Sequence, residues 1–181
     1  MQKANHIMYL HGLEGSPQGT KGSWMRQFMN AIAPEMPARR TNLEQSFLDS
    51  YTVALAAVHK YEPKVIVGSS FGGAILMRLL QSGDWSGNAV MLAPAGIMYG
   101  IGETIPKGST AIIIHSPSDA IVSYSDSQKV IKNSPSRAEL WPAPTSDAPE
   151  GNHRLSDIIE NGQLCRAVTT QLLKITPKLS A

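Results

Sequence analysis

The sequence predicts an α/β fold in which a mainly parallel sheet of about six strands lies between two layers of helices. Short runs of apolar, often β-branched residues alternate along the chain with longer segments that carry apolar residues at helical spacing. The short runs are continuously apolar, which is typical of parallel strands buried on both faces. No repeat or linker divides the chain, so we expect a single domain over residues 1–181.

The expected elements follow one another in a regular order. Apolar runs predict strands over 6–10, 64–68, 88–93, 110–115 and 138–141, with a weaker strand within 37–43. Apolar residues at helical spacing predict helices over 19–33, 47–61, 71–81, 125–133 and 155–175. Proline and glycine supply several of the helix ends, namely Pro34, Pro63 and Gly83.

The charge, the apolar runs and the cysteine count of the sequence limit the kinds of partner and compartment that we expect for the protein. Sixteen Lys and Arg against fourteen Asp and Glu give a net charge of +2, and the densest basic spot is only Arg39-Arg40, so no nucleic-acid partner is expected. No run approaches the ~20 apolar residues that span a bilayer, and residues 1–15 lack a secretory signal, so we expect a cytoplasmic protein without a membrane partner. The single cysteine, Cys165, excludes an intrachain disulfide and is interpreted as a buried structural thiol.

The segment Gly68-Ser69-Ser70-Phe71-Gly72 matches the pattern G-x-S-x-G. It lies between an expected strand and an expected helix, where a sharp turn presents a serine at the end of the sheet. Glycine at both flanking positions lets strand and helix approach closely, and the helix N-terminus favours negative charge. This context predicts Ser70 as a nucleophile. The alternative is a glycine-rich turn that contains serine by chance. The sequence lacks the phosphate-binding patterns G-x-x-x-x-G-K-[ST] and strand-linked G-x-G-x-x-G.

A serine nucleophile needs a histidine base and a carboxylate that orients it. Asp119, after an expected strand, and His153, in a loop before the last helix, follow Ser70 in the chain order of hydrolases with this elbow. Asp119 could instead cap the next turn, and His153 could be an exposed loop residue. Asp147 lies nearer to His153 in sequence, but a strand end is stiffer than a proline-rich loop, which favours Asp119. Asp126 is expected within a helix that faces away.

The loop after the first strand contains His11-Gly12. In folds with this elbow, two backbone N–H groups bind the oxyanion, and here they would belong to Leu13 and Phe71. We expect Gly12 to let this loop approach the site closely and His11 to hold the loop. His115 is expected to pack or hydrogen-bond near the Asp119 loop. The histidines lack spacing such as H-x-x-x-H, so neither a metal site nor a cofactor is predicted.

Four segments in order, residues 9–17, 68–73, 116–122 and 152–155, resemble small bacterial esterase-like members of the α/β-hydrolase superfamily. The resemblance implies that a small-molecule ester or thioester is hydrolysed through a covalent acyl-enzyme. It also implies a catalytic triad of Ser70, Asp119 and His153, with Leu13 and Phe71 as oxyanion donors.

The chain departs from larger members of that superfamily in two ways. They carry two additional strands before the one with which this sequence begins, and they insert a cap where this sequence has only the loop 94–108. We therefore expect a shallow, open pocket in which Met98 and Tyr99 bind a short acyl chain. Two alternatives remain: a non-catalytic binding or regulatory protein on the same fold, and a flavodoxin-like nucleotide or flavin binder. The oligomeric state is left open.

Overall fold

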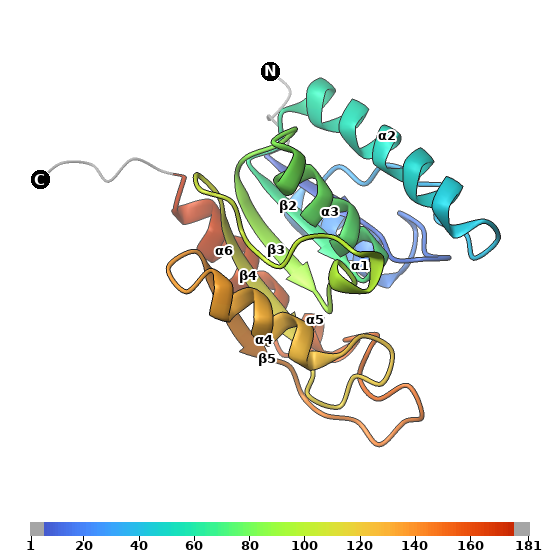
Figure 1. The fold of residues 1–181 in the computed structure, drawn as a ribbon, viewed down its shortest axis with the longest axis vertical. Helices are drawn as coiled ribbons and strands as arrows, with labels where there is room; N and C mark the ends of the chain where they lie inside the picture. Colours follow the sequence, from blue (N-terminus) through green and yellow to red (C-terminus); the bar gives the residue numbers. More distant parts are fainter. Residues whose placement is uncertain (1–5, 176–181) are drawn as a thin grey trace, which may run out of the picture.

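Five parallel strands form the sheet at the centre of the molecule (Figure 1). The computed structural model describes residues 6–175. The strands are β1 (Ile7–Leu10), β2 (Val65–Ser69), β3 (Asn88–Leu92), β4 (Thr110–His115) and β5 (Ala138–Pro142), and they neighbour one another in chain order. Leu10 lies opposite Gly68, and Gly68 lies opposite Met91. The carboxyl ends of the strands therefore meet at one edge, where ligands bind in open α/β sheets.

Helices cover both faces of this sheet (Figure 1). One layer contains α2 (Leu43–Tyr61), α3 (Phe71–Ser82) and α4 (Tyr124–Asn133). The other contains α1 (Thr20–Met29), α5 (Asp157–Glu160) and α6 (Gln163–Leu173). Ile66 packs into the first layer, whereas Val65 and Val67 pack into the second, so the strands need apolar residues on both faces. No helix within residues 6–175 has the length and apolarity needed to cross a membrane.

The sixth, weaker strand takes a different form from the one expected. Residues 37–43 form no strand; instead Ile32 makes a single parallel bridge to Met8 at the outer edge of β1. The Tyr9 N–H donates to the Ile32 carbonyl over 2.7 Å. Pro34 and Pro37 follow this bridge, and because proline has no N–H the pairing does not extend through them. Five strands and this bridge agree with the expected sheet of about six.

The last helix is divided, so the expectation of one helix over 155–175 was wrong. Helix α5 ends at Glu160, and α6 starts after Gly162, whose φ of 74° lies in the left-handed region. This conformation suits glycine and interrupts a right-handed helix. Cys165 lies on α6 and is partly exposed, not buried as expected.

The connection between β3 and β4 contains one short 3-10 turn, η1 (Ile97–Tyr99), over residues 93–109. Within residues 6–175 this segment adds no cap domain to the sheet edge. Tyr99 packs its ring against Phe71 and Phe47, with ring centroids 5.4 and 5.8 Å away. The turn is therefore anchored beside the start of α3, at the edge where the strands end.

Candidate active site

Ser70 sits at the junction between β2 and α3. Its backbone has φ 52° and ψ −110°, a conformation that non-glycine residues rarely adopt and that costs of order 1–3 kcal/mol. The Ser70 N–H donates to the Leu92 carbonyl over 2.8 Å, and the Ala95 N–H donates to the Ser70 carbonyl over 3.1 Å. The end of β3 and the following loop therefore hold the strained turn.

The two glycines that flank the turn are required by packing. A Cβ at Gly72 would stand 2.2 Å from the Leu10 carbonyl oxygen, and one at Gly68 would stand 2.6 Å from the Gly72 oxygen. Gly12 differs, because a Cβ there would lie 3.4 Å from the Ser69 oxygen and 3.6 Å from the Ser70 Cβ, which are ordinary contacts. Packing alone does not demand glycine at this position; a methyl group would occupy the space above Ser70.

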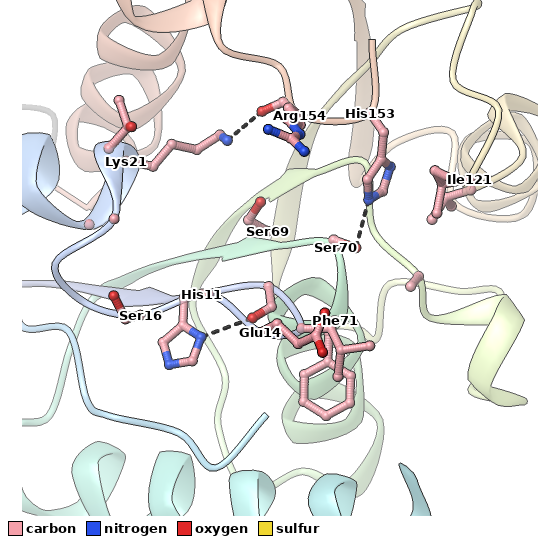
Figure 2. A pocket seen from close by; sticks show the side chains of 18 of the residues that line it. His11, Glu14, Ser16, Lys21, Ser69, Ser70, Phe71, Ile121, His153 and Arg154 are labelled. Atoms are coloured by element: carbon pink, nitrogen blue, oxygen red, sulfur yellow. Dashed lines mark hydrogen bonds between the residues drawn. The ribbon is translucent and has the colours of Figure 1, made fainter. Parts of the chain in front are cut away.

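Ser70, His153 and Asp119 lie in a hydrogen-bonded line. Ser70 Oγ is 3.0 Å from His153 Nε2 (Figure 2), and His153 Nδ1 is 2.8 Å from Asp119 Oδ2. The Asp119 side chain is fully buried, and the His153 side chain is 16% exposed. If Nδ1 carries the proton that it donates to Asp119, the Nε2 lone pair is free to accept the Ser70 hydroxyl proton.

The Asp119 carboxylate accepts four hydrogen bonds. Its Oδ1 accepts from two backbone N–H groups at 2.8 and 2.9 Å, and its Oδ2 is contacted by two imidazole rings at 2.8 and 3.1 Å; the donors are Ile121, Val122, His153 and His115. Burial raises the pKa of Asp119, but these hydrogen bonds outweigh burial and hold the pKa well below its usual range. The carboxylate is therefore ionised at neutral pH.

His115 makes one of these contacts from the end of β4. It is fully buried, and its Nε2 faces both Asp119 Oδ2 and, at 3.2 Å, the Val122 carbonyl. Because both neighbours are acceptors, Nε2 carries the proton, and Nδ1 accepts from the Ser127 hydroxyl over 2.7 Å. Sequence reasoning placed His115 near this loop but missed its direct contact with the carboxylate. Its place four residues before Asp119, at a strand end, is the signal that could have revealed it.

The other two candidate carboxylates lie elsewhere. Asp147 is exposed and, among the described residues, makes no hydrogen bond or ion pair. Asp126 lies on α4 and pairs with Lys129 at 3.2 Å. Asp119 alone of the three contacts His153.

The loop after β1 lies beside Ser70, and both line the same cavity. The Met36 N–H donates to His11 Nε2 over 3.1 Å, so Nδ1 carries the proton that the ring donates to the Gly12 carbonyl over 2.9 Å. His11 thus ties the loop to a distant segment. The N–H groups of Leu13 and Phe71 donate to no acceptor within residues 6–175, and both residues line the cavity beside Ser70.

A cavity of about 910 Å³ opens above Ser70. Part of its wall is apolar and includes Phe71, Ala95, Met98, Tyr99, Ile121 and Val122. The rest is largely polar and includes Tyr9, Ser16, Lys21, Ser69, Arg154 and Ser156. In Figure 2 Lys21 and Ser16 lie to one side of Ser70 and Ile121 lies to the other. Met98 and Ile121 are 56% and 51% exposed, so the apolar part reaches the mouth of the cavity. No group of three or more His, Cys, Asp or Glu side chains within 6–175 is arranged to hold a metal ion.

Several solved structures resemble this chain in fold. The α/β hydrolase domain-containing protein 10 from mouse is 14% identical, with a TM-score of 0.78 over 96% of this chain and 92% of that one. A provisionally assigned hydrolase from Agrobacterium vitis S4 is 17% identical, with a TM-score of 0.74 over 93% and 90%. An alpha-beta serine hydrolase homologue from Coxiella burnetii is 15% identical, with a TM-score of 0.64 over 91% and 84%. At these identities the likeness establishes the fold.

A search of curated protein sequences gives no match. A family model, described as "Uncharacterised protein family (UPF0227)", matches residues 6–100, the part that contains β1, β2, the Ser70 turn and β3. This match covers more than half of the chain. The protein therefore has the α/β-hydrolase fold and belongs to the uncharacterised protein family UPF0227.

Proposed function

We propose that this protein is a serine hydrolase that cleaves a small carboxylic ester or thioester through a covalent acyl-enzyme on Ser70. The observation that carries the proposal is the hydrogen-bonded line from Ser70 Oγ through His153 to the buried Asp119 carboxylate, at 3.0 and 2.8 Å. Two backbone N–H groups without acceptors, those of Leu13 and Phe71, border the same serine. A nucleophile, a base, an orienting acid and oxyanion donors are the four parts that acyl transfer requires.

The first half of the reaction acylates the enzyme. Ser70 Oγ attacks the carbonyl carbon while His153 Nε2 takes the hydroxyl proton, and Asp119 stabilises the imidazolium that forms. The carbonyl oxygen becomes an oxyanion and accepts from the N–H groups of Leu13 and Phe71, each worth about 3 kcal/mol in comparable enzymes. The carbon–oxygen or carbon–sulfur bond of the leaving group then breaks, and His153 gives it the proton.

The second half releases the acid. A water molecule gives a proton to His153 Nε2 and attacks the acyl carbon, and the same N–H groups stabilise the second oxyanion. When that intermediate collapses, the bond to Ser70 Oγ breaks and the serine recovers its proton from His153. The proposed reaction uses only residues of this chain, the ester and one water molecule.

The apolar part of the cavity is proposed to take the acyl chain. The rings of Tyr99 and Phe71 pack in a T-shaped contact, and Met98 and Ile121 are exposed residues of the same cavity wall. Within residues 6–175 the β3–β4 connection adds only the short η1 turn to this wall, and Met98 and Ile121 reach the cavity mouth, so we expect a chain longer than a few carbons to extend into solvent. We expect the highest kcat/KM on short acyl esters and no activation by lipid emulsions, measured on an acyl-length series from acetate to palmitate. A maximum at palmitate would contradict this assignment.

Labelling with a fluorophosphonate probe tests the function directly. The wild-type protein should be labelled on Ser70, and Ser70→Ala should lose both labelling and ester turnover. Ser69→Ala is the matched control, because the neighbouring hydroxyl occupies the variable position of the pattern and should keep a substantial part of the activity. Unchanged turnover in Ser70→Ala would assign the catalysis to another group, and absence of both labelling and turnover in a folded wild-type protein would favour a non-catalytic role on this fold.

A further inference from the structure

Lys21 stands on the polar side of the cavity, at the start of α1. It is partly buried, and its ammonium group donates to the Arg154 carbonyl, immediately after His153 (Figure 2). Among the described residues no carboxylate lies within ion-pair distance of this group. An ammonium group has three N–H donors, so at least one remains available after the bond to Arg154.

The other cations that line the cavity are already neutralised. Arg40 pairs with Glu14 at 2.7 Å, and Arg154 pairs with Glu150 at 3.6 Å. Both arginine side chains are largely exposed, at 73% and 82%, so solvent screens their charges. Lys21 is therefore the cavity-lining cation that lacks a counter-ion, and water screens it less because it is partly buried.

From this geometry we infer that the site takes esters whose leaving group carries an anionic oxygen group, a carboxylate or a phosphate, which binds Lys21. The inference rests on the proposed esterase function and specifies its substrate class. A charged hydrogen bond to a partly buried ammonium is stronger than one between neutral groups. The start of α1 faces the same part of the cavity without an acidic residue in its first turn, which adds favourable potential for an anion.

The position of Lys21 assigns the anion to the leaving group and not to the acyl chain. The leaving atom must receive its proton from His153 Nε2, and Lys21 contacts the residue that follows His153. The acyl chain occupies the apolar wall around Tyr99, and in Figure 2 Lys21 lies across Ser70 from the Ile121 part of that wall.

The lowered pKa of Lys21 is consistent with a site that binds an anionic ligand beside this ammonium group. Burial and, to a smaller extent, the nearby Arg154 lower its pKa, Asp157 opposes them, and together these effects bring the pKa of Lys21 to about 8. At neutral pH the group is still mostly charged but poorly stabilised. A bound anion would stabilise the charged form of Lys21, which no carboxylate within ion-pair distance stabilises among the described residues.

Three matched substrates test the inference: 4-carboxyphenyl butyrate, 4-phosphonophenyl butyrate and the neutral 4-carbamoylphenyl butyrate. The quantity measured is the kcat/KM of each anionic ester divided by that of the neutral ester, in wild type, Lys21→Gln and Lys21→Arg. Comparing this ratio between proteins cancels the intrinsic reactivity of each ester. Glutamine keeps a donor toward the Arg154 carbonyl but loses the charge, and arginine keeps the charge.

We expect Lys21→Gln to lower the ratio by roughly tenfold or more for at least one anion, as the loss of a charged hydrogen bond implies, and Lys21→Arg to retain most of it. The anion with the larger fall identifies carboxylate or phosphate. For the carboxylate ester, the wild-type ratio should be level below about pH 7 and fall as the pH rises through about 8, because Lys21 loses its proton there. In Lys21→Arg the ratio should stay level to pH 10, because arginine keeps its proton there.

Two results would overturn the inference. An unchanged ratio in Lys21→Gln, with both esters slowed equally, would leave Lys21 with only the structural task of holding the His153 loop. A fall in the ratio only for an acyl-side carboxylate, tested with phenyl hemisuccinate against its neutral monoamide, would move the anion to the other side of the ester. Failure of the esterase function itself is distinct, because then neither ester is turned over in a Ser70-dependent manner.

Discussion

The two segments that carry the proposed nucleophile, Ser70, and the proposed base, His153, are held in place differently. The elbow around Ser70 is fixed by its own glycines, by the strand and helix that it directly joins, and by two backbone hydrogen bonds to the end of the neighbouring β3 and its loop. The His153 loop, residues 144–156, depends on contacts from distant segments. The Ser116 hydroxyl donates to the Pro144 carbonyl over 2.6 Å, the Ala120 N–H donates to Glu150, and Lys21 donates to Arg154.

Because of this difference, we expect substitutions in the elbow to affect mainly folding stability and substitutions in the His153 loop to affect mainly the reaction rate. The elbow directly follows β2, which pairs with both β1 and β3, so a change there disturbs packing on which the whole fold depends. The His153 loop lies at the sheet edge, so a change there can displace the imidazole while the core stays intact. A shift of about 1 Å in a catalytic group can cost a hundredfold in rate.

Among substitutions that leave Ser70 in place, the largest loss of kcat/KM is expected at the contact between Asp119, in the loop after β4, and His153. Asp119→Asn should lower kcat/KM by roughly 10²–10⁴-fold while the fold persists, because an amide can stabilise the wrong imidazole tautomer and carries no charge. Asp147→Asn is the matched control within the His153 loop and should cost less than about tenfold, since Asp147 is exposed and does not reach the site. The measurement is kcat/KM of both variants on one ester, with circular dichroism as the check on folding. A larger loss of kcat/KM in Asp147→Asn than in Asp119→Asn would assign the orienting role to Asp147.

Glycine substitutions compare the two segments directly. A Cβ at Gly151 would stand 1.5 Å from the Ser118 carbonyl oxygen, so Gly151→Ala must push the His153 loop away from the Asp119 loop. We expect about a hundredfold loss of kcat, the cost of a misplaced catalytic group, with a small fall in Tm. Gly72→Ala, which clashes with β1, should instead lower Tm steeply or prevent folding.

Gly162→Ala is the control for backbone strain in these glycine variants. Gly162 has a positive φ of 74°, but nothing lies within 4 Å of its Cβ position. It should cost about 1 kcal/mol of stability and leave kcat unchanged. Equal losses of kcat in Gly151→Ala and Gly162→Ala would show that strain, not loop displacement, is responsible.

A smaller effect is expected at His115, which supports Asp119 from β4. His115→Leu removes a hydrogen bond at 3.1 Å from the carboxylate and should lower kcat roughly tenfold with little change in KM, as expected for a residue that positions the acid. His115→Gln, which can offer an N–H near the Nε2 position, should recover part of this loss. If Gln and Leu are equally impaired in kcat at equal Tm, the contact has no positioning role.

The smallest effect concerns stability in acid. Hydrogen bonds hold the pKa of Asp119 below its unfolded value of about 3.9, so its ionised form contributes stability above that value, and the contribution is lost as pH falls further. The free energy of unfolding of wild type should therefore exceed that of Asp119→Asn most at neutral pH. Urea unfolding between pH 3 and 7 should show the gap narrowing below about pH 4. A gap that is constant over this range would mean that the carboxylate is not stabilised as charged.

The sequence by itself indicated the strands of a parallel sheet, the helices up to α4 and the turn that carries Ser70, because each leaves a pattern among neighbouring residues. Apolar runs, helical spacing and the glycines around Ser70 act over a few residues. The sequence also proposed Asp119 and His153 through chain order and resemblance, and the stiffness of a strand end favoured Asp119 over Asp147, but the contact between Asp119 and His153 depends on how distant segments pack.

Only the tertiary structure decided the contacts that join distant segments. The bridge at Ile32, the approach of His115 to Asp119 and the reach of Lys21 to Arg154 each depend on how separate elements pack. Lys21 and Arg154 are 133 positions apart, and no periodicity along the chain relates such positions. The division of the cavity into an apolar and a polar side arises in the same way, because its walls come from loops that meet only after the sheet has formed.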